Sequence, residues 1–313
     1  MYCPICNSKA LSVFSLKKEF LFKELKDYFG DELPLECKLL DYEIMRCTKC
    51  TLEYSSPLEA GSNLFYQWIT SRKGYYPKSR WEWFAVTEEI EKRKKTNSAS
   101  ILDVGCGGGN FLEIARKIPS LRLFGLDTTP ESIKQCRDKG FDAYCQTIES
   151  FQDSYPGDKF DFLVSFHCLE HISNPKSFVK SMLTLLKPEG SIFISTPYSP
   201  MSFESDWFDI LNHPPHHLLR WNKKAYDELA FQLGCQVKYY MPPARSVLGR
   251  TTNTFHLSKL GKNQPTSKLN LLTTAIKNPL ILSRIFFHQL MRKKVNGKTA
   301  ADVILVELSF ANN

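Results

Sequence analysis

The chain has 313 residues, of which 42% are hydrophobic and 24% charged, and its formal net charge is +8. This length suits one large domain with a small accessory module, and the composition is that of an ordinary globular protein. No apolar run approaches the roughly 20 residues of a membrane-spanning helix, and the first residues lack the basic and apolar regions of a secretory signal. We therefore expect a cytoplasmic protein.

Four of the cysteines form two close pairs early in the chain, Cys3 with Cys6 and Cys47 with Cys50. Two Cys-x-x-Cys pairs supply four thiolates for tetrahedral zinc, and a closed four-sulfur site is structural rather than catalytic. The long spacer, with a helix predicted over 17–29, resembles a zinc ribbon with an insertion. We predict a zinc-ribbon-like module over residues 1–60 that binds structural zinc. The alternative is four unrelated cysteines packed in a core.

Residues 61–99 are rich in aromatic side chains and end in a charged run, 87–95, with a helical composition. We predict a helical connector that contributes to the substrate pocket.

From residue 100 onward, short apolar runs alternate with helical patterns, which is typical of a parallel sheet covered on both faces. We therefore predict a doubly wound α/β domain over 100–313. Helices are expected over 111–117, between Thr129 and Gly140, and over 176–186 and 225–233. The expected strands are 100–104, 121–126, 141–145, 160–166, 191–195, 236–240 and 303–308.

A glycine-rich loop, with Gly105, Gly107 and Gly109, follows the first of these strands, and Asp127 closes the second. Such a loop lets the backbone approach a ligand, and a carboxylate at the second position can accept both hydroxyls of a ribose. A dinucleotide and S-adenosylmethionine both fit this much. The dinucleotide pattern needs another small residue where Asn110 or Leu112 stands. Asp103, before the glycines, suits a ligand with an ammonium and a sulfonium and would repel a pyrophosphate.

These residues, the strand 160–166 and the loop 186–190 resemble the class I methyltransferases over about residues 100–242. The resemblance implies a seven-stranded sheet with an antiparallel last strand, which 303–308 would supply. It also implies that Asp103 and the glycines line the methionine end of S-adenosylmethionine and that Asp127 holds its ribose. Thr147 and Ile148 would lie near the adenine, and Phe166, which ends the fourth strand, would line the same site.

Histidines follow two of the strands whose carboxyl ends should form the site. His171 follows the fourth strand, and His216 and His217 lie in a proline-stiffened loop after the fifth. Methyl transfer needs an aligned nucleophile and a proton acceptor, and histidine suits both tasks. We predict that His171, His216 or His217 acts as base or orienting group, although each could merely bridge loops. A metal held by His213, His216 and His217 is disfavoured because no acidic residue stands at ligand spacing.

The segment 243–300 forms a basic insertion, because no Asp or Glu occurs between Glu228 and Asp302 while twelve Lys and Arg residues do. Helices are predicted over 269–277 and 280–293. Such charge indicates an anionic partner, unless it is only a solvated basic face. An apolar helix face with a basic end can also lie on an anionic membrane, or it can cover the sheet.

The sequence thus predicts an S-adenosylmethionine-dependent methyltransferase, with O-methylation of a sugar or a surface-polysaccharide intermediate as the leading function. The acceptor is expected to be anionic, as a sugar phosphate, a nucleotide sugar or a lipid-linked sugar, and the lipid-linked case implies peripheral association with a membrane surface. An RNA methyltransferase is the alternative, ranked lower because no Asn-Pro-Pro-Tyr-like tetrapeptide follows the fourth strand. A cofactor-binding protein without catalysis ranks last. The sequence indicates no oligomeric state.

Overall fold

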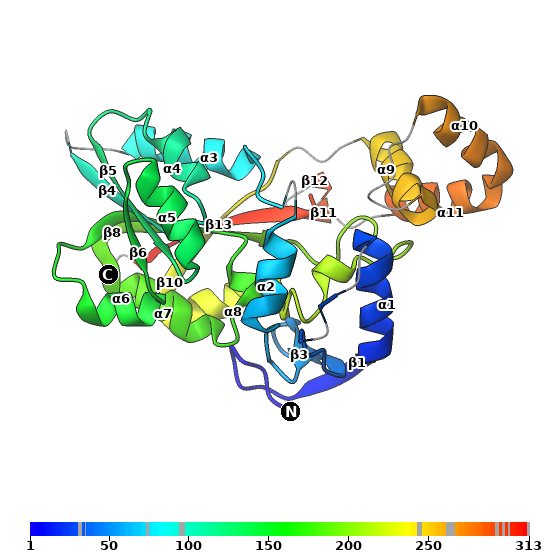
Figure 1. Cartoon of the computed structure of the whole chain (residues 1–313), viewed down its shortest axis with the longest axis horizontal. Coiled ribbons are helices and arrows are strands. Elements are labelled where there is room, and N and C mark those ends of the chain that lie inside the picture. Colours follow the sequence, from blue (N-terminus) through cyan, green and yellow to red (C-terminus); the bar gives the residue numbers. More distant parts are fainter. Residues whose placement is uncertain are drawn as a thin grey trace.

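The computed structural model describes residues 1–30, 33–34, 36–72, 75–93, 98–242, 246–260, 267–291, 294–295, 298–299 and 301–311. A large sheet with helices on both faces fills one side of the molecule (Figure 1). A smaller sheet built from the start of the chain lies beside it, and three helices stand at the far end.

Within the described residues, the large sheet has seven strands in the order β10-β13-β8-β7-β4-β5-β6. The strands from β4 to β8 run parallel, whereas β13 is antiparallel to both β8 and β10. This confirms the predicted seven-stranded, mostly parallel sheet with an antiparallel last strand. Its strands are β4 (Ala99–Val104), β5 (Leu121–Asp127), β6 (Asp142–Cys145), β7 (Phe160–Phe166), β8 (Leu186–Pro197), β10 (Cys235–Tyr240) and β13 (Val303–Phe310).

Both faces of the sheet are buried, because successive residues of a strand point to opposite faces. In β4, Ile101 belongs to the core on one face and Leu102 to the core on the other. A strand buried on both sides must be apolar at nearly every position, which explains the short continuous apolar runs in the sequence. One face is covered by α3 (Trp81–Arg93), α4 (Asn110–Ala115) and α5 (Pro130–Asp138), the other by α6 (Ile148–Ser154), α7 (Pro175–Leu185) and α8 (Lys223–Leu233).

The strand β8 starts earlier than predicted, since Leu186 already pairs with Phe160 of β7. The segment 187–190 was expected to be a loop. Lys187 Nζ there lies 2.9 Å from both carboxylate oxygens of Asp161 on β7. Pairing with the neighbouring strand therefore extends β8 through a proline- and glycine-containing segment.

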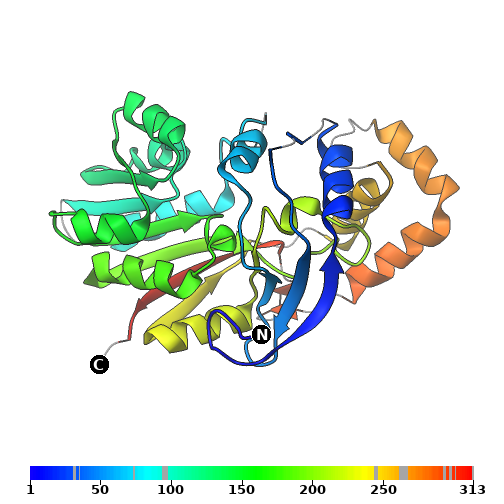
Figure 2. The same ribbon diagram turned by 60° about the horizontal axis from the view of Figure 1, so that its bottom comes forward.

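The smaller sheet joins the start of the chain to the large domain. It consists of β1 (Ala10–Leu16), β2 (Tyr42–Cys47), β3 (Glu53–Ser56) and β9 (Leu219–Arg220), all antiparallel. The helix α1 (Lys18–Phe29) connects β1 to the region before β2, as predicted (Figure 2). Because β9 comes from the large domain, residues 1–60 complete their sheet with a strand from beyond the predicted boundary.

An ion pair reinforces this junction. The buried Arg220 guanidinium on β9 donates from Nε to Glu53 of β3 at 2.8 Å and from Nη2 to Glu204 at 2.5 Å. A buried guanidinium that binds two carboxylates holds both in fixed positions. The first 60 residues are therefore fastened to the large domain by both backbone and side chains.

The insertion after β10 forms a separate group of helices, α9 (Val247–Leu260), α10 (Lys268–Lys277) and α11 (Pro279–Leu290), of which α9 was not predicted. It stands away from the large sheet (Figure 1). Buried Ile285 and Gln289 face α9, where Arg250 Nε donates to the Gln289 side chain at 3.0 Å. Among the described residues, no helix combines the length and apolar character needed to cross a membrane. Arg245, Lys262, Arg292 and Lys293 lie outside the described residues.

Candidate functional site

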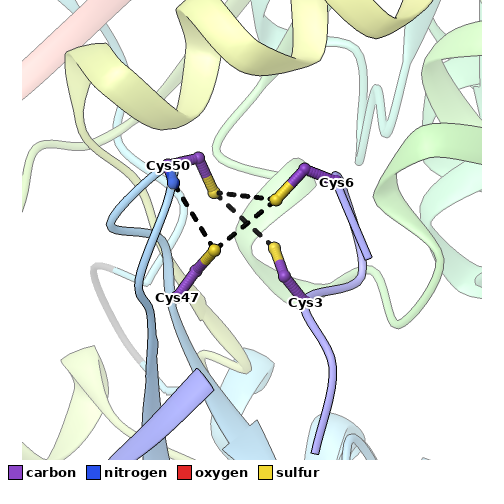
Figure 3. A group of neighbouring side chains, drawn as sticks. All are labelled: Cys3, Cys6, Cys47 and Cys50. Atoms are coloured by element: carbon purple, nitrogen blue, oxygen red, sulfur yellow. Dashed lines mark hydrogen bonds between the residues drawn. The ribbon is translucent and has the colours of Figure 1, made fainter. Parts of the chain in front are cut away.

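The four predicted zinc ligands come together in space (Figure 3). The sulfur of Cys3 lies 3.6 Å from that of Cys50, and the sulfur of Cys6 lies 3.5 Å from that of Cys47 and 3.9 Å from that of Cys50. Zinc bound at about 2.3 Å to each sulfur of a tetrahedron separates the sulfurs by about 3.8 Å. The observed spacing therefore fits a four-thiolate zinc site.

The backbone around the cysteines also fits such a site. Asn7 and Thr51 each follow the second cysteine of a pair and adopt positive φ angles of 54° and 59°. Backbone N–H groups of Ile5 and Lys49 donate to the first sulfur of their pairs at 3.5 and 3.4 Å. Hydrogen bonds to sulfur favour the thiolate that a metal requires.

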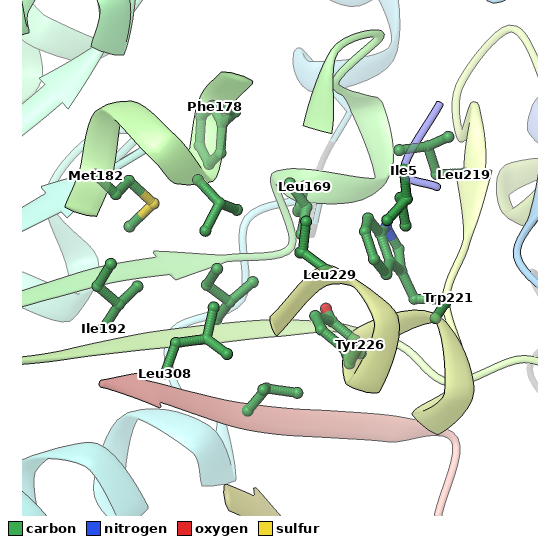
Figure 4. Packing of buried hydrophobic residues seen from close by; sticks show 14 of the residues in the cluster. Ile5, Leu169, Phe178, Met182, Ile192, Leu219, Trp221, Tyr226, Leu229 and Leu308 are labelled. Carbon is green, nitrogen blue, oxygen red and sulfur yellow. The ribbon is translucent and has the colours of Figure 1, made fainter. Parts of the chain in front are cut away.

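The cysteine cluster is packed directly on the large domain. Figure 4 shows Ile5, from the first pair, against Leu219 and Trp221, close to Leu169. Leu169 opens a short helical turn, Leu169–His171, that ends at one of the predicted histidines. The zinc-ribbon-like module thus supports the segments that carry the histidines.

A cavity of about 920 Å³ opens at the carboxyl ends of β4, β5 and β7. Ligand pockets usually measure about 300–1,000 Å³, so this one has room for two ligands, and parallel sheets place their ligands at this edge. Eight of the eleven residues predicted to hold the cofactor or act in catalysis line it: Asp103, Gly105, Gly107, Asp127, Phe166, His171, His216 and His217.

The glycine-rich loop and Asp127 form one wall of the cavity. The Asp127 carboxylate accepts a hydrogen bond from the backbone N–H of Gly107 at 3.0 Å and from that of Thr129 at 2.8 Å. Gly107 has a φ angle of 51°, and a Cβ atom there would lie 3.3 Å from Tyr76. The loop therefore fixes the carboxylate toward the cavity, and a side chain at Gly107 would be strained.

Asp103 lies deeper, at the end of β4, and is 2% exposed. Among the described residues, its Oδ1 atom has no hydrogen-bond partner. Burial raises the pKa of this carboxyl well above its usual range, with smaller contributions from Cys136 and Asp127. A buried carboxylate without a partner is costly, so Asp103 is suited to receive a cationic group from a ligand.

Three other predicted cofactor residues lie outside the cavity wall that the described residues form. Gly109 begins α4, and a Cβ atom there would approach the sulfur of Cys136 to 2.9 Å. Thr147 caps α6 by accepting a hydrogen bond from the backbone N–H of Ser150, and Ile148 is buried in the core. Structural tasks account for these three residues.

The three predicted histidines form one cluster, although His171 and the other two come from different loops. The ring centroid of His171 lies 4.7 Å from that of His216 and 4.8 Å from that of His217. The rings of His216 and His217 stack with centroids 4.5 Å apart. Burial lowers the pKa of His171 and of His217 below the usual range. His213 does not join the cluster, since its Nε2 atom faces Arg220 at 3.2 Å.

The sequence analysis missed a chain of acidic and basic groups behind this cluster. His167, with a φ angle of 51°, lies with Nε2 2.9 Å from a Glu82 oxygen and Nδ1 3.4 Å from Glu170. Burial alone would lower the pKa of His167, but Glu170 and Glu82 raise it. The Glu170–His171 dipeptide after β7 was visible in the sequence, but only the histidine was selected.

Residues 61–99, the predicted connector, carry aromatic and cationic side chains that line the cavity. Tyr75 lies with its hydroxyl 2.9 Å from Nε2 of His216, and Tyr66 donates to the backbone carbonyl of the same histidine at 3.2 Å. Arg72 and Arg80 also line the cavity. In contrast, none of the described residues of the 243–300 insertion lines it. Positive charge near the site therefore comes from the connector.

Comparison with known proteins agrees with this arrangement. A family model described as a methyltransferase domain matches residues 79–239. Ubiquinone biosynthesis O-methyltransferase of Xanthomonas euvesicatoria is 32% identical over 115 residues, which cover 35% of this chain and 47% of that protein. The enzyme of the same name from Idiomarina loihiensis is 37% identical over 102 residues, covering 31% and 41%. The matched region thus spans less than half the length of these curated relatives.

Solved structures of methyltransferases are also similar. A S-adenosylmethionine-dependent methyltransferase from Archaeoglobus fulgidus is 17% identical, with a TM-score of 0.46, and covers 72% of this chain and 93% of its own. The plantazolicin methyltransferase BamL, solved with S-adenosylhomocysteine, is 15% identical, with a TM-score of 0.48, covering 77% and 89%.

Proposed function

Because the chain belongs to the methyltransferase-domain family, we propose that it transfers a methyl group from S-adenosylmethionine to a hydroxyl of a small molecule. The observation that carries this proposal is the cavity wall in which Asp103, Asp127 and the glycine-rich loop meet. Similar relatives are named as O-methyltransferases of ubiquinone biosynthesis, which is a small-molecule pathway. Zinc, in contrast, is assigned to the four cysteines, which do not line this cavity.

Different residues of the cavity are assigned to cofactor binding and to the acceptor. Asp103 would pair with the ammonium of the cofactor, Asp127 would accept its ribose hydroxyls, and Phe166 would line the same site. When bound, S-adenosylmethionine supplies a methyl group on a sulfonium. His171, His216 and His217 lie in the same cavity and are assigned to orient the acceptor hydroxyl and assist the loss of its proton.

We divide the chain into three parts by their proposed roles. Residues 1–60 form a zinc-ribbon-like module that supports the histidine segments, 61–99 a connector that completes the acceptor pocket, and 100–313 the methyltransferase domain with its basic insertion at about 243–300. Thr147, Ile148 and Gly109 are left with structural roles, so the adenine would be held by other parts of the cavity, such as the segment Thr128–Glu131 that lines it.

For the acceptor, we favour a sugar or a sugar-containing intermediate that carries an anionic group. Arg72 and Arg80 give the cavity the positive charge that a phosphate requires. Two stacked imidazoles and several tyrosines offer the hydrogen-bonding and aromatic surface that suits a sugar ring. Enzymatic methylation of sugar phosphates compared with uncharged phenols would test this choice directly.

Replacing Asp127 with alanine should weaken S-adenosylmethionine binding by at least about tenfold. The change removes charge-assisted hydrogen bonds of about 1.5–3 kcal/mol each, and 1.4 kcal/mol corresponds to a factor of ten. Calorimetric titration of wild type and variant measures the difference, with Asp138→Ala as control, since Asp138 is an exposed carboxylate of α5 that pairs with Lys134 and does not line the cavity. Unchanged affinity in Asp127→Ala, or tight NADH binding by the wild type, would overturn the cofactor assignment.

A lipid-linked acceptor would bring the protein to the membrane surface, and we assign the insertion to that contact. Its helices expose apolar side chains, including Leu280, which is 83% exposed, and Phe287 and Leu290. All three are more than half exposed, whereas Arg284 and Gln289 of α11 contact Asp206 and the backbone carbonyl of Ser202. Because α11 packs on α9, we favour this membrane contact over the alternative in which its apolar face covers the sheet core.

Anionic liposomes should therefore sediment with the protein at low salt and release it as the salt concentration rises, because screening shortens the reach of surface charge. The Arg292/Lys293/Lys294→Gln variant, whose first two positions lie outside the described residues, should lose most of this binding. Leu280→Ser should weaken it at every salt concentration, since it removes apolar contact and no charge. Equal partitioning of all three proteins would assign the basic charge to another role.

A further inference from the structure

The histidine cluster has the arrangement of a metal site. One ring nitrogen from each of His171, His216 and His217 lies within 4.8 Å of the other two. Nitrogens bound to one tetrahedral zinc ion at about 2.0–2.1 Å lie about 3.4 Å apart. Side-chain adjustments of about an ångström would therefore bring all three into contact with one ion.

The hydrogen bonds of the rings fix which nitrogen is available. Nδ1 of His171 lies 2.6 Å from the backbone carbonyl of His216, and Nδ1 of His216 lies 2.8 Å from that of Leu211. Nδ1 of His217 lies 3.2 Å from the side-chain oxygen of Asn212. Each of these oxygens only accepts, so each Nδ1 donates and each ring keeps its lone pair on Nε2. Metal-binding histidines are oriented by bonds of this type.

A buried carboxylate lies beside the imidazoles. Glu170 is 1% exposed and lines the cavity, and among the described residues neither of its oxygens accepts a hydrogen bond. Its Oε1 atom lies 3.9 Å from Nε2 of His217. The same Oε1 atom lies 3.4 Å from Nδ1 of His167. Glu170 shares the single His167 imidazole with Glu82, so a cation bound at the neighbouring imidazoles would further stabilise these buried carboxylates.

We propose that His171, His216, His217 and Glu170 bind one divalent transition-metal ion, and that this ion holds the acceptor hydroxyl for methylation. Three imidazoles and one carboxylate are a ligand set for ions such as zinc, cobalt, manganese or iron. The Tyr75 hydroxyl, which donates to Nε2 of His216, would yield that lone pair to the ion. Two features separate this site from the cysteine cluster: it contains no thiolate, and it lines the cavity.

The role in acceptor binding rests on the function proposed above. A hydroxyl whose oxygen binds a divalent ion loses its proton to water more readily. The oxygen then carries the electron pair that forms the new bond to carbon, while the electron pair of the broken carbon–sulfur bond stays on sulfur. Acceptors with two neighbouring hydroxyls, which can chelate the ion, are therefore the class that this site suits best.

Metal content after equilibrium dialysis against Co²⁺ tests the site in the full-length protein. Zinc plus cobalt should total about two ions per chain in the wild type, one at the cysteines and one at the histidines. His171→Ala, His217→Ala and Glu170→Gln should each hold about one ion, because each loses a ligand. The matched control is His213→Gln, which removes an imidazole of the same loop whose Nε2 faces Arg220. It should keep both ions.

A second measurement separates this proposal from the methyltransferase assignment. Titration of each protein with S-adenosylmethionine should give unchanged affinity in Glu170→Gln and His217→Ala, and this also shows that the variants are folded. A wild type that binds S-adenosylmethionine but never holds more than one divalent ion would overturn the metal site and leave the methyltransferase intact. A wild type that holds two ions but does not bind S-adenosylmethionine would overturn the proposed function and the role assigned to the ion in it.

Discussion

Replacing Cys47 with serine is expected to release the zinc ion and to lower the free energy of unfolding by more than about 3 kcal/mol. Structural zinc in small modules contributes roughly 10–16 kcal/mol of binding energy, which the folded state retains only while all ligands are present. Three thiolates and a hydroxyl bind zinc far more weakly than four thiolates, because serine is not deprotonated as readily as cysteine. Elemental analysis and chemical denaturation measure the two effects.

The loss should extend beyond the first 60 residues. Cys47 ends β2, β2 pairs with β3, and β3 pairs with β9. The strand β9 follows directly after the loop of His216 and His217, and the backbone N–H of Leu218 donates to the carbonyl of Glu170 at 2.9 Å. Loosening the cysteine cluster therefore loosens both histidine segments, and methyl-transfer activity should fall together with stability.

The control is Cys145→Ser, since Cys145 is exposed and lies outside the cluster. It should keep the zinc and the wild-type unfolding midpoint. A folded Cys47→Ser protein with full zinc content and an unchanged midpoint would show that the four sulfurs do not form the site.

The large sheet was predictable because its signals are local. The run 100–104, its glycine-rich end and the alternation with helices depend on neighbouring residues, and all of these features are found in the structure. The short helix α6 and the early start of β8 were missed. Thr147 is the N-cap residue of α6, and Leu186 belongs to β8 because it pairs with Phe160. Both roles depend on partners that the sequence pattern does not show.

The site was less predictable because its groups come from distant segments. His171 and His216 are separated by 45 residues and meet only through the fold. Glu170 was not predicted as a site residue, because its burial is not visible in the sequence. The sequence disfavoured a metal at His213, His216 and His217 because no acidic residue stands at ligand spacing. In the structure the nearby carboxylate comes from the segment after β7, and His213 faces Arg220.

Replacing Asp103 with asparagine is expected to stabilise the ligand-free protein increasingly as the pH rises, because the asparagine side chain carries no charge that the folded protein must bury. Burial raises the pKa of Asp103, so the folded protein binds a proton there more tightly than the unfolded chain does. A raised carboxyl pKa means that stability falls as the pH rises above the unfolded value of about 4. With increasing pH, the unfolding temperature of the wild type should therefore drop further below that of Asp103→Asn. Thermal unfolding of both proteins at several pH values without cofactor measures this difference.

The same substitution should weaken S-adenosylmethionine binding by about ten- to 150-fold, because a charged hydrogen bond of about 1.5–3 kcal/mol to the cofactor's ammonium is lost. Asp103→Asn should thus raise the stability of the ligand-free protein but lower its affinity for the cofactor. The carboxylate of Asp103 lacks a cationic partner only while the ammonium of the cofactor is absent. Excess S-adenosylmethionine should accordingly raise the unfolding temperature of the wild type more than that of Asp103→Asn. A variant that is both less stable without ligand and unchanged in cofactor affinity would show that Asp103 is held by a partner within the fold and does not face the cofactor.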